Sequence, residues 1–257
     1  MSESNVLAVT VANAETTMGL FAGDELLATW GVSTNANITA DEALQCFWSF
    51  LNVKDLPTPD DAIMCSVVPA LTTAWSEALA SLSGRRALVV GPGLKSGIAM
   101  DYKDPGQVGG DRVACAVAAK ALYGSPALVV DFGAATTFTV VSEKGSLAGG
   151  AIAPGLRVSM EALSETAAQL TETDLKAPAH VVGRTTLDAV RAGVVLGEAA
   201  KVDGLVEAMW DELGYETALV ATGRWAHVVC AHSRHEFDIR SDLALQGLLA
   251  IRNANRK

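Results

Sequence analysis

A short motif that occurs twice constrains the fold of this chain more than any other feature: an apolar run, a polar turn and a second apolar run. The first copy begins at residues 7–16 and the second at residues 129–137. Laid over each other, the copies place Thr10 opposite Asp131, at an offset of 121 residues in a chain of 257. Each copy predicts a β-hairpin. Two similar halves that each open with a hairpin predict a duplicated α/β fold with two lobes.

The turn of the second copy carries the residues of a phosphate-binding hairpin. Asp131 can hold a divalent cation, and Gly133 lets backbone N–H groups approach an anion without an intervening Cβ. Thr136 and Thr137 add hydroxyls that can donate to phosphate oxygens. A buried strand that ends in an ordinary Asp-capped turn would have similar residues, so the turn by itself leaves both interpretations open.

The turn of the first copy lacks two of these residues. Thr10 and Ala12 stand where the second copy has its acid and its glycine, so one of two expected cation-binding carboxylates is missing. Asn13 and Thr16 remain as candidate nucleotide contacts. Halves of this kind resemble the actin-like kinase architecture: duplicated ribonuclease H-like lobes, each with a mixed five-stranded sheet, and ATP in a cleft between them.

Composition excludes several other classes of protein. The formal charge is −10, and the sequence has no basic run that could neutralise a nucleic-acid backbone. It also has no apolar stretch of roughly 18 residues and no positively charged start typical of a signal peptide. The four cysteines are scattered without a C-x-x-C pair, which indicates reduced thiols. We therefore expect a cytoplasmic protein without nucleic-acid or membrane partners.

Hydrophobic periodicity and turn residues predict the order of the elements. Residues 1–110 are expected to form the first lobe, of order β-β-β-α-β-α-β, and residues 111–257 the second. The expected strands cover residues 6–11, 16–21, 26–31, 61–67, 86–90 and 218–221, besides the second hairpin. The expected helices cover residues 41–51, 71–82, 113–122, 156–169, 186–213 and 243–254. Thr39 is the expected N-cap of the first helix.

A second group of candidate residues lies at the expected start of the helix at residues 113–122. Asp111 and Arg112 follow Gly109 and Gly110, which places a carboxylate and a guanidinium at a positive helix terminus. The carboxylate could accept the proton of a hydroxyl that attacks ATP, while the guanidinium neutralises an anionic substrate. The alternative is simpler, because Asp is a common residue at a helix start.

Three further segments carry candidate ligand contacts. Gly149 and Gly150 offer a surface without side chains to a base or ribose, and Thr222 and Gly223 follow a strand with a hydroxyl and bare backbone. Residues 183–186 combine a cation with two hydroxyls directly before a helix. Ordinary turns, and helix capping by Thr185 or Thr186, account for the same residues.

The order of these pieces resembles the type III pantothenate kinases, which phosphorylate pantothenate at the start of coenzyme A synthesis. The likeness runs from Val6 to Arg252. It is carried by residues 92–98, 108–112, 129–133, 136–138, 141–145, 149–155, 202–206, 221–223 and 245–248. Several such strings in one order are more specific than any single glycine motif.

The resemblance implies roles for the candidate residues. Asp111 would be the base that acts on the primary hydroxyl of pantothenate, and Arg112 would bind pantothenate in a pocket that Tyr102 and Thr186 line. Asp131 would face the ATP phosphates and Mg²⁺. The resemblance further implies the product 4'-phosphopantothenate, a monovalent cation such as K⁺ or NH4⁺, and a dimer with the pantothenate pocket at the subunit boundary. The residues assigned to these sites are, for the substrate, Tyr102, Gly109, Gly110, Arg112 and Thr186, and, for ATP, Asn13, Thr16, Gly133, Thr136, Thr137, Gly149, Gly150, Thr222 and Gly223.

The departures from the family pattern gather at ATP-facing positions. The family's first loop reads D-x-G-N-T, whereas residues 10–14 read T-V-A-N-A, and Ala134 replaces the first Thr of the second loop. Three hypotheses follow: a kinase subunit with an impaired ATP site, paired in a dimer with an intact paralogue; a self-sufficient homodimeric kinase in which Glu15, Asp131 or solvent replaces the missing acid; and a non-catalytic regulatory or binding homologue.

Overall fold

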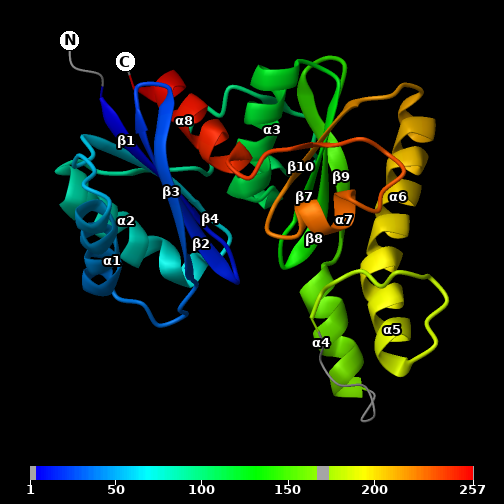
Figure 1. The fold of residues 1–257 in the computed structure, drawn as a ribbon. Helices are drawn as coiled ribbons and strands as arrows, with labels where there is room; N and C mark the ends of the chain where they lie inside the picture. The colour runs from blue at the N-terminus through cyan, green and yellow to red at the C-terminus, as the bar shows by residue number, and fades with distance from the viewer. Residues whose placement is uncertain (1–3, 167–173, 257) are drawn as a thin grey trace. The chain divides into compact units, whose positions relative to one another are not determined.

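A computed structural model describes residues 4–166 and 174–256 (Figure 1). The chain divides into two compact units, Met1–Ala121 with Asp242–Lys257, and Leu122–Ser241. These bounds differ from the expected division at residues 110 and 111, because the helix that carries Asp111 and the last helix group with the first sheet. The lobe boundary at that place stays a prediction.

The first unit is built on a five-stranded mixed sheet of order β3-β2-β1-β4-β5. Its strands are β1 (Asn5–Val11), β2 (Glu15–Ala22), β3 (Glu25–Ser33), β4 (Asp61–Ser66) and β5 (Leu88–Val89), and a short strand β6 (Ala99–Met100) follows. Its helices are α1 (Ala40–Val53), α2 (Pro69–Ser83), α3 (Gly110–Tyr123) and α8 (Leu243–Asn255), with a 3-10 turn at Pro105–Gln107.

Strand alternation divides the side chains of this sheet between two layers. Leu7, Val9 and Val11 point into a core shared with α1 and α2, where Phe47 and Trp75 meet edge to face with ring centroids 5.5 Å apart. Helix α1 begins as expected, with Thr39 and Glu42 forming a capping box. Helix α8 packs against β1 and β4.

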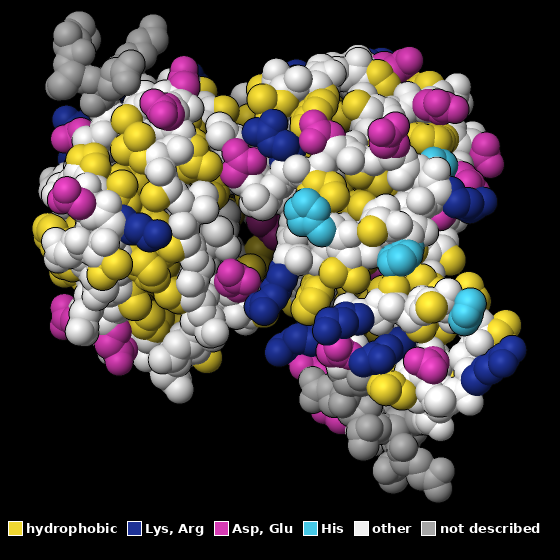
Figure 2. All heavy atoms as spheres, in the orientation of Figure 1, with side chains coloured by type: hydrophobic (Ala, Val, Ile, Leu, Met, Phe, Trp, Pro, Cys, Tyr) yellow, Lys and Arg dark blue, Asp and Glu magenta, His cyan; other side chains and the backbone are white. Residues whose placement is uncertain are grey.

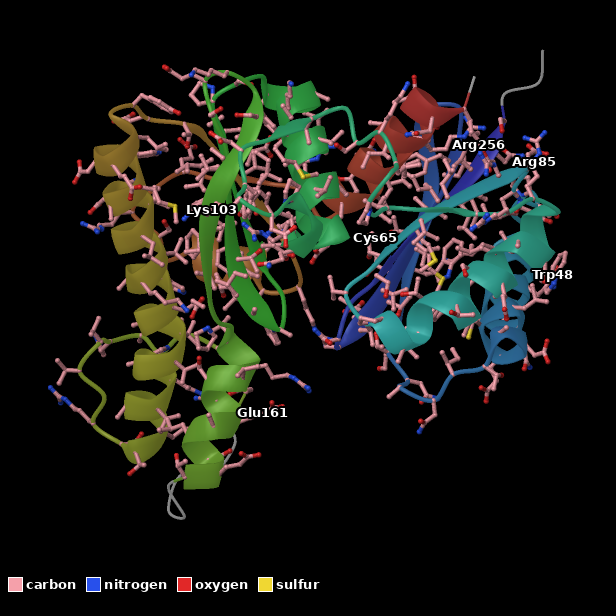
Figure 3. The ribbon with its side chains drawn as sticks, turned by 180° about the vertical axis from the view of Figure 1, so that it is seen from behind. Trp48, Cys65, Arg85, Lys103, Glu161 and Arg256 are labelled. Carbon is pink, nitrogen blue, oxygen red and sulfur yellow. The ribbon has the colours of Figure 1, made fainter. Side chains whose placement is uncertain are left out.

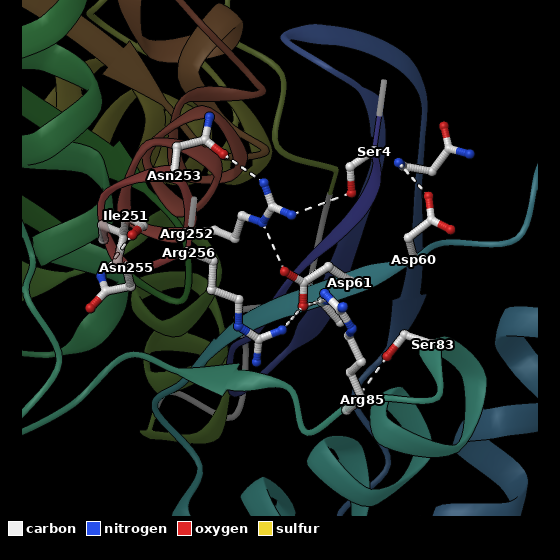
Figure 4. Close-up of polar contacts among 12 residues, drawn as sticks. Ser4, Asp60, Asp61, Ser83, Arg85, Ile251, Arg252, Asn253, Asn255 and Arg256 are labelled. Carbon is white, nitrogen blue, oxygen red and sulfur yellow. Dashed lines mark hydrogen bonds and ion pairs between the residues drawn. The ribbon is translucent and has the colours of Figure 1, made fainter. Parts of the chain in front are cut away.

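A buried carboxylate fastens α8 to the sheet (Figure 4). Asp61, at the start of β4, is fully buried and accepts a hydrogen bond from Arg252 Nε at 2.8 Å. Its other oxygen is paired with Arg256, whose guanidinium also donates to the Arg86 carbonyl. Two cations from the C-terminal helix and the residue that follows it thus neutralise one acid of the first unit.

The second unit has the strand order β11-β10-β7-β8-β9. These strands are β7 (Ala127–Phe132), β8 (Ala135–Val141), β9 (Ser146–Pro154), β10 (Ala218–Thr222) and β11 (Asp238–Ile239). The helices are α4 (Leu156–Thr166), α5 (Thr186–Arg191), α6 (Gly197–Leu213) and α7 (Ala226–Cys230), and a π-helical turn at Ala192–Leu196 joins α5 to α6. Phe132, Phe138 and Val202 belong to the core between sheet and helices.

The two sheets repeat one topology, which confirms the predicted duplicated α/β fold. Strands β3-β2-β1-β4-β5 correspond in order to β9-β8-β7-β10-β11, and in both sets the first hairpin strand pairs parallel with a strand later in the chain. Thr10 pairs with Thr17, as Asp131 pairs with Thr137. The register therefore places Thr10 and Asp131 at equivalent positions. The turns differ in length, because residues 12–14 connect the first hairpin and residues 133–134 the second.

Several elements differ from the sequence-based expectations. The single helix expected at residues 186–213 is α5, a π-helical turn and α6 in succession, and the strand expected at residues 86–90 is reduced to Leu88–Val89. Helix α7 and strands β6, β9 and β11 were not predicted. The helix expected at residues 156–169 is α4 up to Thr166, and its remaining residues lie outside the described part.

The surface shows no single dominant charge in the view of Figure 2. Acidic and basic side chains are interspersed over this face, and several Lys and Arg side chains gather over α4 and α5. Among residues 4–166 and 174–256, no helix combines the length and the apolar character needed to cross a membrane.

Candidate active site

The second hairpin presents its acid at the carboxyl end of β7. Asp131 pairs with Thr137 on β8 and with Thr222 on β10, so these three residues share one face of the sheet. The carboxyl ends of parallel strands are the usual place for ligand binding in α/β sheets. Asp131 and Thr137 are half-buried, which leaves both side chains within reach of a ligand.

Two glycines near this carboxylate are required by the fold. Gly223 has φ +89°, and a Cβ there would collide with the Asp131 carboxylate and lie 2.7 Å from the Phe132 carbonyl carbon. Gly155 donates to the Ala134 carbonyl at 3.2 Å, and a Cβ there would lie 2.8 Å from the Gly133 carbonyl oxygen. The turn is therefore held by bare backbone on two sides.

Gly133 is different, because the fold itself tolerates a side chain there. A Cβ at this position would make only ordinary contacts, 3.6 Å from the Ala135 carbonyl oxygen and 3.8 Å from Asp131 Oδ1. The residue is half-buried and has no positive φ. The missing side chain thus leaves space directly beside the Asp131 carboxylate, where a phosphate group could approach the backbone.

Gly149 and Gly150 lie in β9, opposite Val140 and Thr139. Their φ angles are +148° and +153°, values that residues with a side chain rarely adopt. No atom lies within 4 Å of the position that a Cβ of Gly149 would take. This part of β9 offers open backbone to a flat ligand such as a base.

The first hairpin has the same frame without the acid. The Thr10 hydroxyl donates to the Thr17 carbonyl at 3.4 Å, and Asn13 is exposed in the turn. Thr34, the residue directly after β3, holds this turn, since its N–H donates to the Ala14 carbonyl at 3.0 Å and its hydroxyl to the Ala12 carbonyl at 2.7 Å. The turn is well fixed but carries no carboxylate at residue 10.

The candidate base lies at the same end of the first sheet. Helix α3 starts so close to β4 that a Cβ on Gly110 would be 2.9 Å from the Cβ of Cys65, the register partner of Thr10 (Cys65 is labelled in Figure 3). Burial raises the pKa of the Cys65 thiol well above its usual range, and the charge of Asp111 raises it further. Asp111 is therefore near the end of β4, close to Thr10, the position at which the expected carboxylate of the first hairpin is missing.

Arg112 and Tyr102 form the other part of this cluster. Arg112 Nη2 donates to the Tyr102 hydroxyl at 3.0 Å, and the guanidinium carbon lies 5.9 Å from the tyrosine ring centroid. Asp111 Oδ1 accepts the N–H of the next residue, Arg112, at 2.8 Å within the first turn of α3. A Cβ on Gly109 would lie 2.5 Å from Asp111 Oδ1, so this glycine makes room for the carboxylate.

Thr186 lies in the other unit and is the exposed first residue of α5. The cap of this helix is Thr185, whose hydroxyl accepts the N–H of Asp188 at 3.1 Å. A pocket that includes both Tyr102 and Thr186 stays a prediction.

The donors at the second hairpin fit a Mg²⁺ ion that is held jointly with phosphate. In the described part of the chain, no three His, Cys, Asp or Glu side chains gather into a site made of protein alone. Mg²⁺ is commonly bound by one or two carboxylates together with substrate phosphates and water. One half-buried acid, Asp131, next to a hydroxyl and open backbone meets that requirement.

Comparison with known proteins decides the family. The sequence model described as Type III pantothenate kinase matches residues 6–208. A Type III pantothenate kinase of Dehalococcoides mccartyi is 39% identical over 259 residues, with 100% of each chain covered. The chain belongs to the type III pantothenate kinase family. The family implies ATP as a substrate.

Two solved structures show that this family member shares its fold with more distant proteins. Component A of (R)-2-hydroxyglutaryl-CoA dehydratase from Acidaminococcus fermentans matches with a TM-score of 0.59 at 14% identity, over 98% of this chain and 100% of that one. A ROK hexokinase from Thermus thermophilus matches with a TM-score of 0.52 at 11% identity, over 96% and 97%. The expected actin-like kinase fold is confirmed.

Sequence reasoning missed the polar residues that support the second hairpin. Glu198 and Lys201 on α6 contact the hairpin and the end of β9. The one signal in the sequence was an acid within the small and apolar residues 192–200.

Proposed function

We propose that this pantothenate kinase homologue takes part in the ATP-dependent phosphorylation of pantothenate to 4'-phosphopantothenate, as a subunit whose own ATP site is impaired. The observation that carries the proposal is the register of the two hairpins, which puts Thr10 where the second hairpin has Asp131. The fold is preserved, and so are the acid and the glycine of the second hairpin, Asp131 and Gly133. The acid of the first hairpin is not.

The preserved residues have complementary roles in this reaction. Asp111 accepts the proton of the primary hydroxyl of pantothenate as the oxygen attacks the terminal phosphorus of ATP. Arg112, oriented by Tyr102, neutralises the carboxylate of pantothenate. Asp131 and Thr137 bind on the phosphate side, and Gly149, Gly150, Thr222 and Gly223 give the nucleotide access to backbone. Asp131 would hold Mg²⁺, which would neutralise charge on the phosphates, and the second cation that we propose is monovalent, K⁺ or NH4⁺.

The missing acid at residue 10 should lower the rate of phosphoryl transfer by a measurable factor. A hydrogen bond or ion contact that involves a charge contributes about 1.5–3 kcal/mol. Converted to rates at about 1.4 kcal/mol per factor of ten, its loss corresponds to a decrease of about ten- to several-hundred-fold when the positioning of the metal is included. We therefore propose that the chain works in a dimer with an intact paralogue, which supplies the ATP site while Tyr102 and Thr186 contribute to the pantothenate pocket.

Activity assays on defined subunits test this proposal. The chain purified alone, with ATP, Mg²⁺, K⁺ and pantothenate, should turn over slowly or not at all. Coexpression with a neighbouring paralogue should yield a complex that is more active than either chain. A complex without activity above that of the paralogue would favour the non-catalytic regulatory homologue instead.

One observation favours the self-sufficient homodimer as the second candidate. Glu15 lies two residues before Thr17 on β2, so it shares a face of the sheet with Thr17 and Thr10. Its carboxylate lies over Gly31, where a Cβ would collide with it. Glu15 could therefore supply a carboxylate to the first hairpin. If the isolated chain is active, Glu15→Gln should remove most of that activity, whereas under the impaired-subunit proposal it changes nothing.

A further inference from the structure

Helix α6 carries a buried acid that contacts the second hairpin. The side chain of Glu198 is 3% exposed. Its Oε1 accepts the hydroxyl proton of Thr136 at 2.6 Å, and its Oε2 is paired with Lys201 Nζ at 2.6 Å. The O–H···O distance is in the range of charge-assisted hydrogen bonds, and the N···O distance is just below that range.

Lys201 extends this contact to the end of β9. Its ammonium group donates to the Pro154 carbonyl at 2.9 Å. The next residue, Gly155, donates to the Ala134 carbonyl within the hairpin turn at 3.2 Å. Glu198 and Lys201 together therefore fix strand β8 on one side of the turn and the end of β9 on the other.

Strand alternation separates Thr136 from the ligand side of the hairpin. Asp131 and Thr137 share one face, whereas Phe132 and Thr136 share the opposite face, which packs on the core. Thr136 is 1% exposed, and its hydroxyl is used by Glu198. The geometry thus gives adjacent threonines different tasks: Thr137 faces outward with the acid, and Thr136 anchors inward.

The first hairpin has the same inward anchor without a charge. Thr16 holds the register position of Thr136, is fully buried, and has its hydroxyl 3.1 Å from that of Thr34. The hairpin that lacks the acid is thus anchored by two neutral hydroxyls. The hairpin that keeps the acid is anchored by a buried carboxylate and an ammonium group.

A buried ion pair is a poor means of stabilising a fold, because the desolvation of both charges offsets most of their attraction. Such an ion pair can instead fix the geometry of the groups that it contacts. We propose that Glu198 and Lys201 are positioning residues that hold the second hairpin, through Thr136 and Pro154, in the arrangement that binds the ATP phosphates. The inference rests on the proposed function, since it assumes that the second hairpin binds ATP.

Isosteric variants and a matched control test the proposal by calorimetric titration with MgATP and, separately, with pantothenate. Glu198→Gln keeps an acceptor for Thr136 but removes the ion pair, and Thr136→Val removes the hydroxyl. Each should weaken MgATP binding about tenfold and leave pantothenate binding unchanged. Thr136→Ser keeps the hydroxyl and should bind MgATP as tightly as the wild type. The double variant Glu198→Gln with Thr136→Val should bind MgATP no more weakly than either single variant, because both changes break the same linkage.

Asp203→Asn is the control, because Asp203 is an equally buried acid on the same helix. Its side chain is also 3% exposed, but it is bonded to Ser233 and Arg234, away from the hairpin. It should lower the melting temperature without changing MgATP affinity. If Glu198→Gln does not fold, Lys201→Met replaces it, because Lys201 is 30% exposed and can lose its charge more easily.

Three results would contradict the inference. Unchanged MgATP affinity in Glu198→Gln and Lys201→Met refutes positioning. So does a loss in Asp203→Asn of the same size, since it would show a general effect of stability. If the wild-type chain shows no MgATP binding at all, the second hairpin does not bind the nucleotide and the inference fails, whereas the proposed function, in which a paralogue supplies the ATP site, fails only if coexpression yields no gain in activity.

Discussion

Replacing Thr10 with Asp and Ala12 with Gly would give the first hairpin the two residues that the second hairpin has. The register shows that the new carboxylate would stand at the end of β1, where Asp131 stands at the end of β7. Ala12 has no positive φ, so the glycine changes the space available rather than the backbone conformation. The fold should accept both changes.

The expected gain follows from one added charged contact. Such a contact contributes about 1.5–3 kcal/mol, or about a ten- to 150-fold lower Kd for MgATP. Asp111 lies near Cys65, the register partner of Thr10, and its like charge offsets part of this gain. We therefore expect about tenfold tighter binding.

Titration calorimetry with MgATP measures the effect, and Thr10→Asn with Ala12→Gly is the matched control. The control has nearly the same shape without the charge and should gain little. Equal affinities for the wild type, the variant and the control would refute the reasoning, because the end of β1 would then not face the nucleotide.

Further predictions concern single residues. Gly133→Ala should keep the melting temperature within a few degrees while weakening MgATP binding severalfold, because the fold leaves room for this Cβ; thermal scanning and calorimetry measure the two effects. Asp61→Asn should lower the free energy of unfolding in urea by about 3–5 kcal/mol, since it leaves Arg252 and Arg256 without their acid, whereas Asp60→Asn should cost under about 1 kcal/mol. Burial and the charge of Asp203 raise the pKa of Cys230 to about 11, so its rate of reaction with a disulfide reagent should rise about tenfold per pH unit from pH 8 to 10, and Asp203→Asn should increase the rate at pH 8. In any active complex to which this chain contributes the base, Asp111→Asn should abolish turnover while pantothenate still binds.

The fold could be predicted from the sequence because the repeat is a local pattern. Apolar runs and polar turns of fixed spacing are sufficient to define two hairpins, and their offset alone aligned Thr10 with Asp131 as the register later confirmed. The π-helical turn at Ala192–Leu196 could not be predicted from the sequence, because its residues suit an α-helix equally well. Strand β11 has only two residues, too few to show any period.

The site was less accessible to sequence reasoning, because neighbouring residues can face opposite ways. Thr136 and Thr137 look alike in sequence, yet their faces are decided by the pairing of β7 with β8. The partner of Thr136 is Glu198, 62 residues away. No local pattern relates two positions at that separation, so the anchor of the hairpin emerges only from the three-dimensional structure.

The attachment of α8 to Asp61 has a consequence for how the protein is made. The first unit draws its strands from the beginning of the chain and its last helix from the end, while the second unit is continuous in sequence. During translation, Asp61 is synthesised about 190 residues before Arg252 and Arg256, the two arginines that pair with it. The middle of the chain can therefore fold first, and the N-terminal part becomes fully stable only after the final helix leaves the exit tunnel.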